Sequence, residues 1–372
     1  MTTKILSGIY ATTYNLNSPV TTLSVTATGY LGAGLLAAGT NAYTVVNNGH
    51  IRGKYEGIEL IGGGAVTNAG TVLAYSTTTS GTGVILGNGG TVSNLAGGLI
   101  AGYYGIQVGA QAGTVNNQGV VLGYGKFAVE LVAGGRVTNG STTNTNATIR
   151  GIIGIYAGLS TTVTNFGSVI GAGTSSAAAY LKNGGTVTNG SASDTHALMA
   201  AGAIAVAITG NSGTVINYGT IRDTGTAGAA VALEGGGVVT NGSAADTTAL
   251  IDSNGKYGIA GVGVATTVNN FGTVLAAYSG ASAAVYLKNG GTVTNGSTKD
   301  TGAHIASSIG VAVLGASGTV TNFGTLGGAL TEIGVAVEYG GRIVNGSATD
   351  TTALIQAYVG AAATTKSGTV IN

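Results

Sequence analysis

One short segment recurs along this chain and limits what the chain can fold into. "GGTVTNGS" occupies residues 184–191 and again 290–297, and variants such as "GVVTNGS" and "GTVINYGTI" lie around both copies. Alignment on the asparagine of V-x-N gives fourteen anchors spaced by 21 to 29 residues. A period of this length is typical of a solenoid, in which each repeat packs only on its neighbours.

Each repeat contains three short segments that predict β-strands. The first is "GTVTN", the second resembles "FGSVI" (166–170), and the third resembles "GIEL" (57–60) or "AVYL" (284–287). Apolar and polar residues alternate with a period of two between glycines, and no segment shows a 3.6-residue period. We therefore predict an all-β fold with almost no helix, a single-stranded parallel β-helix (β-solenoid) of about 14 coils of 21–29 residues. Right-handed winding is expected, because parallel crossovers take that hand.

The composition excludes several other classes of protein. Glycine supplies 70 of 372 residues without a G-X-Y period and with one proline, which excludes collagen, and 44% apolar residues argue against disorder. The chain has no cysteine, so it has no disulfide or thiolate metal site. A net charge of +1 gives no signature for nucleic acid, and no long apolar run predicts a membrane-spanning helix.

The anchor asparagines are the most regular feature of the repeat. We interpret them as a ladder at one turn of each coil, where each amide bonds the main chain and the next asparagine in the stack. The predicted ladder consists of Asn47, Asn68, Asn94, Asn117, Asn139, Asn165, Asn189, Asn217, Asn241, Asn270, Asn295, Asn322 and Asn345, with Asn372 as the last anchor.

The domain organisation follows from where the repeat frame holds. Residues 1–42 are Thr-rich and fit the frame poorly, so they are predicted to form an N-terminal β cap, and residues 43–372 form the solenoid. From Asn139 onward every second coil carries extra residues, as in "NGSASDTHAL" (189–198), which gives a two-coil repeat of about 50 residues. No comparable cap follows at the other end, which suggests either a longer parent protein or an end that stacks on another copy.

The long coils place an acidic residue at equivalent positions. These are Asp194, Asp246, Asp300 and Asp350, with Asn144 in the fifth long coil. An aspartate followed by threonine in a turn most often accepts a hydrogen bond from its own backbone, which is the favoured interpretation. The alternative is a loop-local or intermolecular cation site, with Ca²⁺ as the candidate ion. Two-coil spacing separates these residues by about 10 Å, too far for one shared ion.

Outward positions of the third strand provide candidate contact residues. Tyr156, Tyr180 and Tyr286 share one such position, where they could contact a sugar or another molecule, although β-propensity alone also explains them. Glu59 and Glu130 share a position three coils apart, too far for paired carboxylate catalysis. A polysaccharide-active enzyme and an ice-binding Thr array are therefore minor alternatives.

Two tandem units carry a resemblance to known proteins. "GTVINYGTIRDTGTAGAAVALEGG" (213–236) and "GTVTNFGTLGGALTEIGVAVEYGG" (318–341) resemble the repeat region of bacterial autotransporter passengers and related secreted adhesin-like β-strand-repeat proteins. The resemblance spans about residues 43–372 and brings no catalytic residues with it. It implies a place on the bacterial cell surface or outside the cell. Since the first residues lack an apolar signal segment, we expect export to use a signal outside this chain.

These observations lead to one functional expectation and one alternative. The chain is expected to be a non-enzymatic structural or adhesive surface protein, a rigid stalk for cell-surface or biofilm contact. The alternative is a self-assembling extracellular fibre or layer subunit that stacks end to end. Its expected partners are other copies of itself or cell-surface glycans and proteins, with no nucleic acid, no membrane span and no required cofactor.

Overall fold

The computed structural model describes residues 2–76, 80–277, 282–328 and 331–372. These residues contain β-strands and no helix, and the strands stack in parallel as a β-solenoid of about 14 turns, which confirms the predicted fold class. The chain divides into two compact units: unit 1 comprises residues 1–172 and 178–182, and unit 2 comprises residues 173–177 and 183–372.

Each coil consists of a first, a second and a third strand. In unit 1 one coil is formed by β7 (Tyr43–Asn47), β8 (His50–Gly53) and β9 (Glu56–Leu60). The next coil, β10 (Gly64–Asn68), β11 (Thr71–Ala74) and β12 (Thr82–Leu86), pairs with it strand by strand in parallel. In this register, equivalent positions of successive repeats lie opposite one another. Residues that recur in the sequence therefore form columns along the stack of coils.

The other strands of unit 1 follow the same order. First strands are β1 (Thr2–Leu6), β4 (Val20–Val25), β13 (Gly90–Asn94), β16 (Gly113–Asn117), β18 (Gly135–Asn139) and β20 (Thr161–Asn165). Second and third strands are β2 (Ile9–Tyr10), β3 (Tyr14–Asn15), β5 (Tyr30–Leu31), β6 (Leu35–Ala37), β14 (Leu99–Gly102), β15 (Tyr104–Val108), β21 (Ser168–Gly171) and β22 (Ala177–Leu181). In β17 (Val120–Leu131) and β19 (Thr148–Ala157) the second strand runs directly into the third.

Unit 2 repeats this arrangement. Its first strands are β23 (Gly185–Asn189), β26 (Gly213–Asn217), β29 (Gly237–Asn241), β32 (Thr266–Asn270), β35 (Gly291–Asn295) and β38 (Gly318–Asn322). Its second strands are β24 (Leu198–Ala201), β27 (Thr220–Asp223), β30 (Leu250–Ser253), β33 (Thr273–Ala276), β36 (His304–Ala306), β39 (Thr325–Gly327) and β41 (Leu354–Gln356). Its third strands are β25 (Ile204–Ile208), β28 (Ala229–Leu233), β31 (Tyr257–Gly261), β34 (Ala283–Leu287) and β37 (Ile309–Val313). In β40 (Ile333–Asn345) and β42 (Val359–Ile371) the third strand continues into the next first strand.

The core of each unit is a set of stacked aliphatic columns. In unit 1, Val45, Val66 and Val92 lie opposite one another in successive first strands and are almost completely buried. Full burial of one such side chain contributes roughly 1.5–3 kcal/mol, so a column of them accounts for much of the stability of the stack. A single coil has no partner for these side chains, and stacking provides one.

Glycine is required at the corner that precedes many first strands. Gly237 has φ of +131°, and a Cβ there would lie 1.9 Å from the carbonyl oxygen of Gly213 in the preceding coil. Both the backbone angle and the close approach exclude any side chain at this corner. The G-G pair before "TVTN" in the sequence therefore encodes the turn between the third and the first strand.

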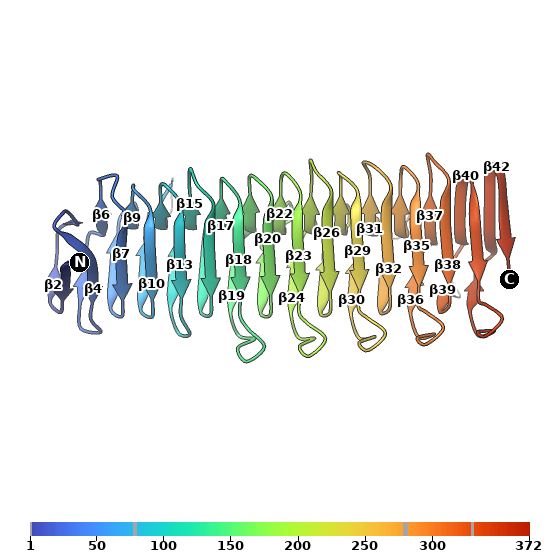
Figure 1. Cartoon of the computed structure of the whole chain (residues 1–372), viewed down its shortest axis with the longest axis horizontal. Coiled ribbons are helices and arrows are strands. Elements are labelled where there is room, and N and C mark those ends of the chain that lie inside the picture. Colours follow the sequence, from blue (N-terminus) through green and yellow to red (C-terminus); the bar gives the residue numbers. More distant parts are fainter. Residues whose placement is uncertain (1, 77–79, 278–281, 329–330) are drawn as a thin grey trace. The chain divides into compact units, whose positions relative to one another are not determined.

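Residues 2–42 also form parallel strands. β4 pairs with both β1 and β7, and Val25 lies opposite Asn47, so the predicted cap consists of strands paired in the same sense as the coils. The extra residues of the long coils form loops after the first strand. Figure 1 shows these loops in unit 2 projecting from one edge, next to β24, β30 and β36.

Candidate functional site

The anchor asparagines form a buried hydrogen-bond ladder in each unit. In unit 1, Asn47 Nδ2 lies 2.7 Å from Asn68 Oδ1, and the same contact continues through Asn94, Asn117 and Asn139 to Asn165. In unit 2 a second ladder runs in the same way through Asn189, Asn217, Asn241, Asn270, Asn295, Asn322, Asn345 and Asn372.

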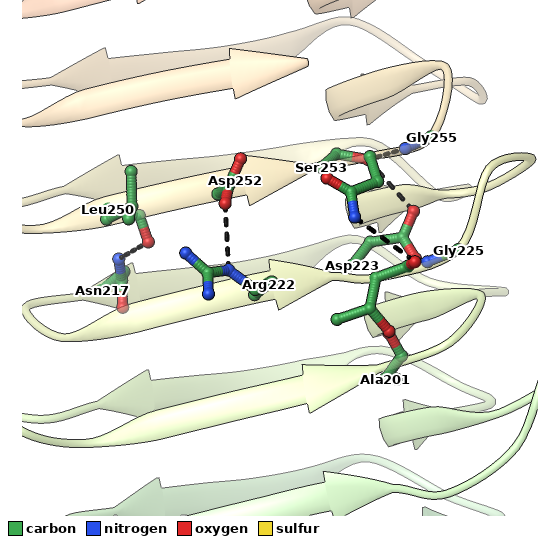
Figure 2. Close-up of polar contacts among 11 residues, drawn as sticks. Ala201, Asn217, Arg222, Asp223, Gly225, Leu250, Asp252, Ser253 and Gly255 are labelled. Atoms are coloured by element: carbon green, nitrogen blue, oxygen red, sulfur yellow. Dashed lines mark hydrogen bonds and ion pairs between the residues drawn. The ribbon is translucent and has the colours of Figure 1, made fainter. Parts of the chain in front are cut away.

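Each rung also bonds the main chain on two levels. Asn217 Nδ2 lies 3.0 Å from the carbonyl oxygen of Gly219 in its own coil and 3.1 Å from that of Leu250 in the next coil, and Figure 2 shows the second contact. Asn217 is fully buried. Because a buried amide without partners is costly, these contacts hold each turn in register.

The third strands of unit 1 carry a mixed acidic and aromatic surface. In register, Glu59 lies beside Ile85, then Gln107, Glu130 and Tyr156 in successive coils. A second column contains Glu56, Thr82, Tyr104 and Phe127. We call these two columns, together with Tyr180, the third-strand face of unit 1.

Aromatic rings stack along this face. Tyr104 and Phe127 meet edge to face at 5.9 Å between ring centroids, and Phe127 stacks on Tyr156 at 4.7 Å with an interplanar angle of 5°. Tyr156 stacks in turn on Tyr180 at 5.8 Å and 4°. The Lys126 ammonium lies 4.7 Å from the centroid of Phe127. The result is a stack of three nearly parallel rings, Phe127, Tyr156 and Tyr180, which Tyr104 meets edge to face.

Polar groups connect the two columns at the acidic part of the face. Thr82 Oγ1 donates to Gln107 Oε1 at 2.8 Å, and Gln107 Nε2 donates to Glu130 Oε2 at 2.6 Å. Burial and then the neighbouring Glu59 carboxylate raise the pKa of Glu56. A hollow of about 290 Å³ lies at this end, lined among others by Lys54, Tyr55, Glu59 and Tyr75.

The structure brings Glu59 beside a carboxylate that the sequence did not single out. Glu59 and Glu130 share one column three coils apart, while Glu56 interacts electrostatically with Glu59. Strict alternation would place Glu56 and Glu59 on opposite sides of the strand. However, the pairing of β9 with β12 passes over Gly57, and Gly57 and Ile58 are both buried, so the alternation shifts at Gly57. The glycine in "EGIE" is the signal that could have indicated this neighbour.

The corresponding face of unit 2 is built mainly from alanine. Ala207 and Ala232 lie in register in one part of the column, and Ala260 and Tyr286 follow. Tyr286 stacks on Tyr257 at 4.6 Å between ring centroids and 23° between planes. Burial, followed by Tyr257 and Glu338, raises the pKa of the Tyr286 hydroxyl. Of the predicted contact residues, Tyr156 and Tyr180 therefore lie together in one aromatic row, and Tyr286 lies in a separate pair.

The loop aspartates lie in the long loops of unit 2 and are nearly buried. Asp246 Oδ1 accepts hydrogen bonds from the backbone N–H of Thr248 at 3.0 Å and from its hydroxyl at 2.7 Å. Asp350 repeats this pattern with Thr352, while Asp194 and Asp300 accept from the backbone of His196 and Gly302. Among the described residues no group of three or more His, Asp or Glu side chains could hold a metal ion.

One buried carboxyl group in unit 2 was not singled out in the sequence. Asp223 is fully buried, and its Oδ1 accepts from Gly225 N–H at 2.8 Å while its Oδ2 accepts from Ser253 Oγ at 3.0 Å (Figure 2). Burial is the largest cause of its raised pKa, against the lowering effect of these bonds. The signal was the alternation in "TIRD", which points Arg222 outward to Asp252 at 2.9 Å and Asp223 inward. Its bonded neighbours are structural, so we assign Asp223 to the scaffold.

Comparisons with known proteins found no match to this chain. No protein-family model matches this chain, and neither a curated protein nor a solved structure is similar to it. The part of the chain that the structure describes contains no helix long and apolar enough to cross a membrane. The architecture is thus a β-solenoid of repeats, and the resemblance to autotransporter passengers remains an interpretation of the sequence.

Proposed function

We propose that this chain is a non-enzymatic structural and adhesive β-solenoid of a bacterial surface. In this proposal the coils form a stiff scaffold, and the third-strand face of unit 1 contacts glycans on a neighbouring surface. The observation that carries the proposal is the row of contacting aromatic rings from Tyr104 to Tyr180 beside the acceptors Gln107 and Glu130. Aromatic rings supply apolar contact to sugar rings, and carboxylates and amides accept from hydroxyl groups.

The scaffold role is supported by where the polar groups of the coil are used. The ladder asparagines, such as Asn94 and Asn217, bond to the coil and to one another, and the inward columns are aliphatic. Such an interior stabilises a long surface without forming a deep pocket. The Glu56–Glu59 pair lies in a small open hollow, and we propose that it belongs to the contact surface and not to a catalytic site.

A co-sedimentation assay tests the adhesive part of this proposal. The probe is an insoluble neutral glucan, and the variants are Tyr156→Ala with Tyr180→Ala in unit 1 and Tyr257→Ala with Tyr286→Ala in unit 2. We expect wild type and the unit 2 variant to sediment with the glucan and the unit 1 variant to lose at least tenfold in binding. Equal binding by all three proteins, or by none, would contradict the proposed contact face.

Self-assembly is a second candidate function, favoured by the parallel, in-register pairing of each coil with the next. Coils that pair with like coils within one chain can also pair with the coils of a second copy. Negative-stain electron microscopy over a range of concentrations separates the two functions. Filaments that lengthen with concentration would make assembly the function, and separate particles at all concentrations would remove it for this chain.

A further inference from the structure

The long loops of unit 2 each bury a carboxylate oxygen that has no hydrogen-bond donor. The atoms are Oδ2 of Asp194, Asp246, Asp300 and Asp350, in side chains of residues that are only 5–7% exposed. In each residue the other oxygen, Oδ1, accepts from the backbone two residues later. One oxygen of the carboxylate is thus satisfied within the turn, and the other is left unpaired in a buried position, which is unfavourable.

The fifth long loop, in unit 1, has an amide at the same position instead of a carboxylate. Asn144 has the same turn: its Oδ1 accepts from Asn146 N–H at 3.2 Å. Its Nδ2, the atom equivalent to the unpaired oxygen, donates to the carbonyl oxygen of Gln118 at 2.8 Å and to Gln118 Oε1 at 3.0 Å. In Asn144, an N–H donor therefore lies at this position and faces two oxygen atoms of the preceding coil.

The loops of the two units are otherwise built alike. Ser141 and Asn144 exchange two backbone hydrogen bonds at 3.0 Å, and Ser243 and Asp246 exchange the same pair at 2.8 and 3.0 Å. The glycine at the start of each loop, Gly140 or Gly242, donates to the carbonyl of the ladder asparagine in the preceding coil at 2.7 Å. The aspartate is therefore held in the place of Asn144, with an oxygen where the asparagine has its NH₂ group.

The neighbour in the preceding coil changes together with the loop residue. Gln118, which follows a ladder asparagine, faces Asn144, and the residues that follow the equivalent ladder asparagines before Asp246, Asp300 and Asp350 are Tyr218, Phe271 and Phe323. Phe271 and Phe323 carry no N–H or O–H group in the place of the glutamine amide, and the Tyr218 hydroxyl donates no hydrogen bond to Asp246 Oδ2. By analogy with Asn144, we expect Oδ2 in each of these three loops to lie toward the preceding coil, and the structure gives this oxygen no hydrogen-bond donor.

We propose that the long loops of unit 2 each bind one hard cation through this oxygen, with Ca²⁺ as the ion. Carboxylate and carbonyl oxygens are the ligands that Ca²⁺ takes, and its flexible coordination accepts main-chain oxygens and water for the rest of its shell. One carboxylate per site makes binding weak, with Kd of about 10⁻⁴ to 10⁻³ M. Asp194 is the weakest of the four, because the His196 ring lies 3.4 Å from its Oδ1.

The test compares the full chain with a variant that carries Asp246→Asn, Asp300→Asn and Asp350→Asn. Both are stripped with EDTA and unfolded by heat in CaCl₂ or in NaCl of equal ionic strength. A control with Glu234→Gln, Glu332→Gln and Glu338→Gln makes the same change of charge in unit 2. With CaCl₂ at tenfold over Kd, wild type and control should gain about 5–7 °C in midpoint from the four sites together. The asparagine variant should start higher without metal and respond only through Asp194, by less than a quarter of the wild-type gain in midpoint.

Two results would overturn the cation sites. One is an equal response to CaCl₂ in wild type and in the asparagine variant, since binding would then lie elsewhere. The other is no response to CaCl₂ in wild type but a rise in midpoint on acidification that the asparagine variant lacks, since a proton and not a cation would then meet the oxygen. Isothermal titration with CaCl₂ gives an independent readout, in which loss of heat in the asparagine variant alone supports the sites.

Discussion

Units 1 and 2 share one coil but present different groups outside it. Both contain a buried asparagine ladder and aliphatic columns in register. On the third-strand face, unit 1 carries carboxylates, amides and a row of rings, where unit 2 carries mainly alanine. The long loops of the two units also differ. In unit 1 the amide of Asn144 is hydrogen-bonded, and in unit 2 the equivalent aspartates each have an unpaired oxygen. The comparison separates residues that every coil needs from residues that give a surface its chemistry.

The largest loss of stability is expected from substitutions in the asparagine ladder, which both units contain. Asn117→Ala in unit 1 removes the contacts of its amide to Asn139, Gly119 and Thr148 and leaves these buried groups unpaired. The free energy of unfolding should fall by about 3 kcal/mol or more. Asn270→Ala in unit 2 should cost a similar amount, because its amide has the same three kinds of contact. Urea denaturation followed by circular dichroism measures both changes.

Each ladder variant has a matched control one residue away. Asn116 and Asn269 precede the ladder residues and point outward from the same strands. Asn116→Ala and Asn269→Ala should each change stability by less than about 0.5 kcal/mol. If the inward and outward substitutions cost the same in either unit, the ladder would not be what holds the coils in register.

Substitutions in the long loops should change stability by a smaller amount, and with opposite sign in the two units. Asn144→Asp replaces a donor by an oxygen that faces the Gln118 carbonyl, so it should cost about 1–3 kcal/mol at neutral pH without added metal. Asp246→Asn in unit 2 should be neutral or stabilising under the same conditions. Thermal unfolding of the two single variants measures both changes in stability. A stabilising Asn144→Asp would show that the loops of the two units do not offer the same environment.

Asp223 predicts a pH dependence that is confined to unit 2. Its pKa is raised in the folded chain, so between the ordinary carboxyl pKa of about 3.9 and the raised value the folded state binds more protons than the unfolded state. Stability from this group is therefore greatest at low pH and is lost as pH rises through the folded pKa. Asp223→Asn keeps an acceptor for Gly225 and should flatten this part of the curve of stability against pH. An unchanged curve would show that the carboxyl group does not titrate in this way.

The smallest effect concerns the aromatic row. Phe127→Leu keeps an apolar side chain but removes the parallel stack on Tyr156, which should cost about 0.5–1.5 kcal/mol. In unit 2, Tyr286→Leu should cost a similar amount, because it removes one stack of nearly the same centroid distance. Chemical denaturation of both variants tests this, and a much larger cost in unit 1 would mean that Phe127 stabilises the coil by its burial and not by stacking.

The sequence predicted the scaffold because repetition makes each residue's environment visible many times. Val in "TVTN" could only point inward in every coil, and the period fixed the number of coils. The surface was harder to predict, because it depends on single coils. The contact between Glu56 and Glu59 required a local shift at Gly57, and the stack of Phe127 on Tyr156 joins two different columns. The unpaired oxygens of the loop aspartates are a matter of contacts between coils, which no local sequence pattern includes.

A tryptophan reporter tests most directly that the third-strand face of unit 1 is the contact surface. The chain has no tryptophan, so Tyr156→Trp and Tyr286→Trp each place a single reporter in an aromatic stack, one in each unit. On titration with soluble dextran, a neutral glucan, we predict a saturable change in emission from Trp at 156 and none from Trp at 286. The same change from both reporters, or a change only at 286, would contradict the division of roles between the two units.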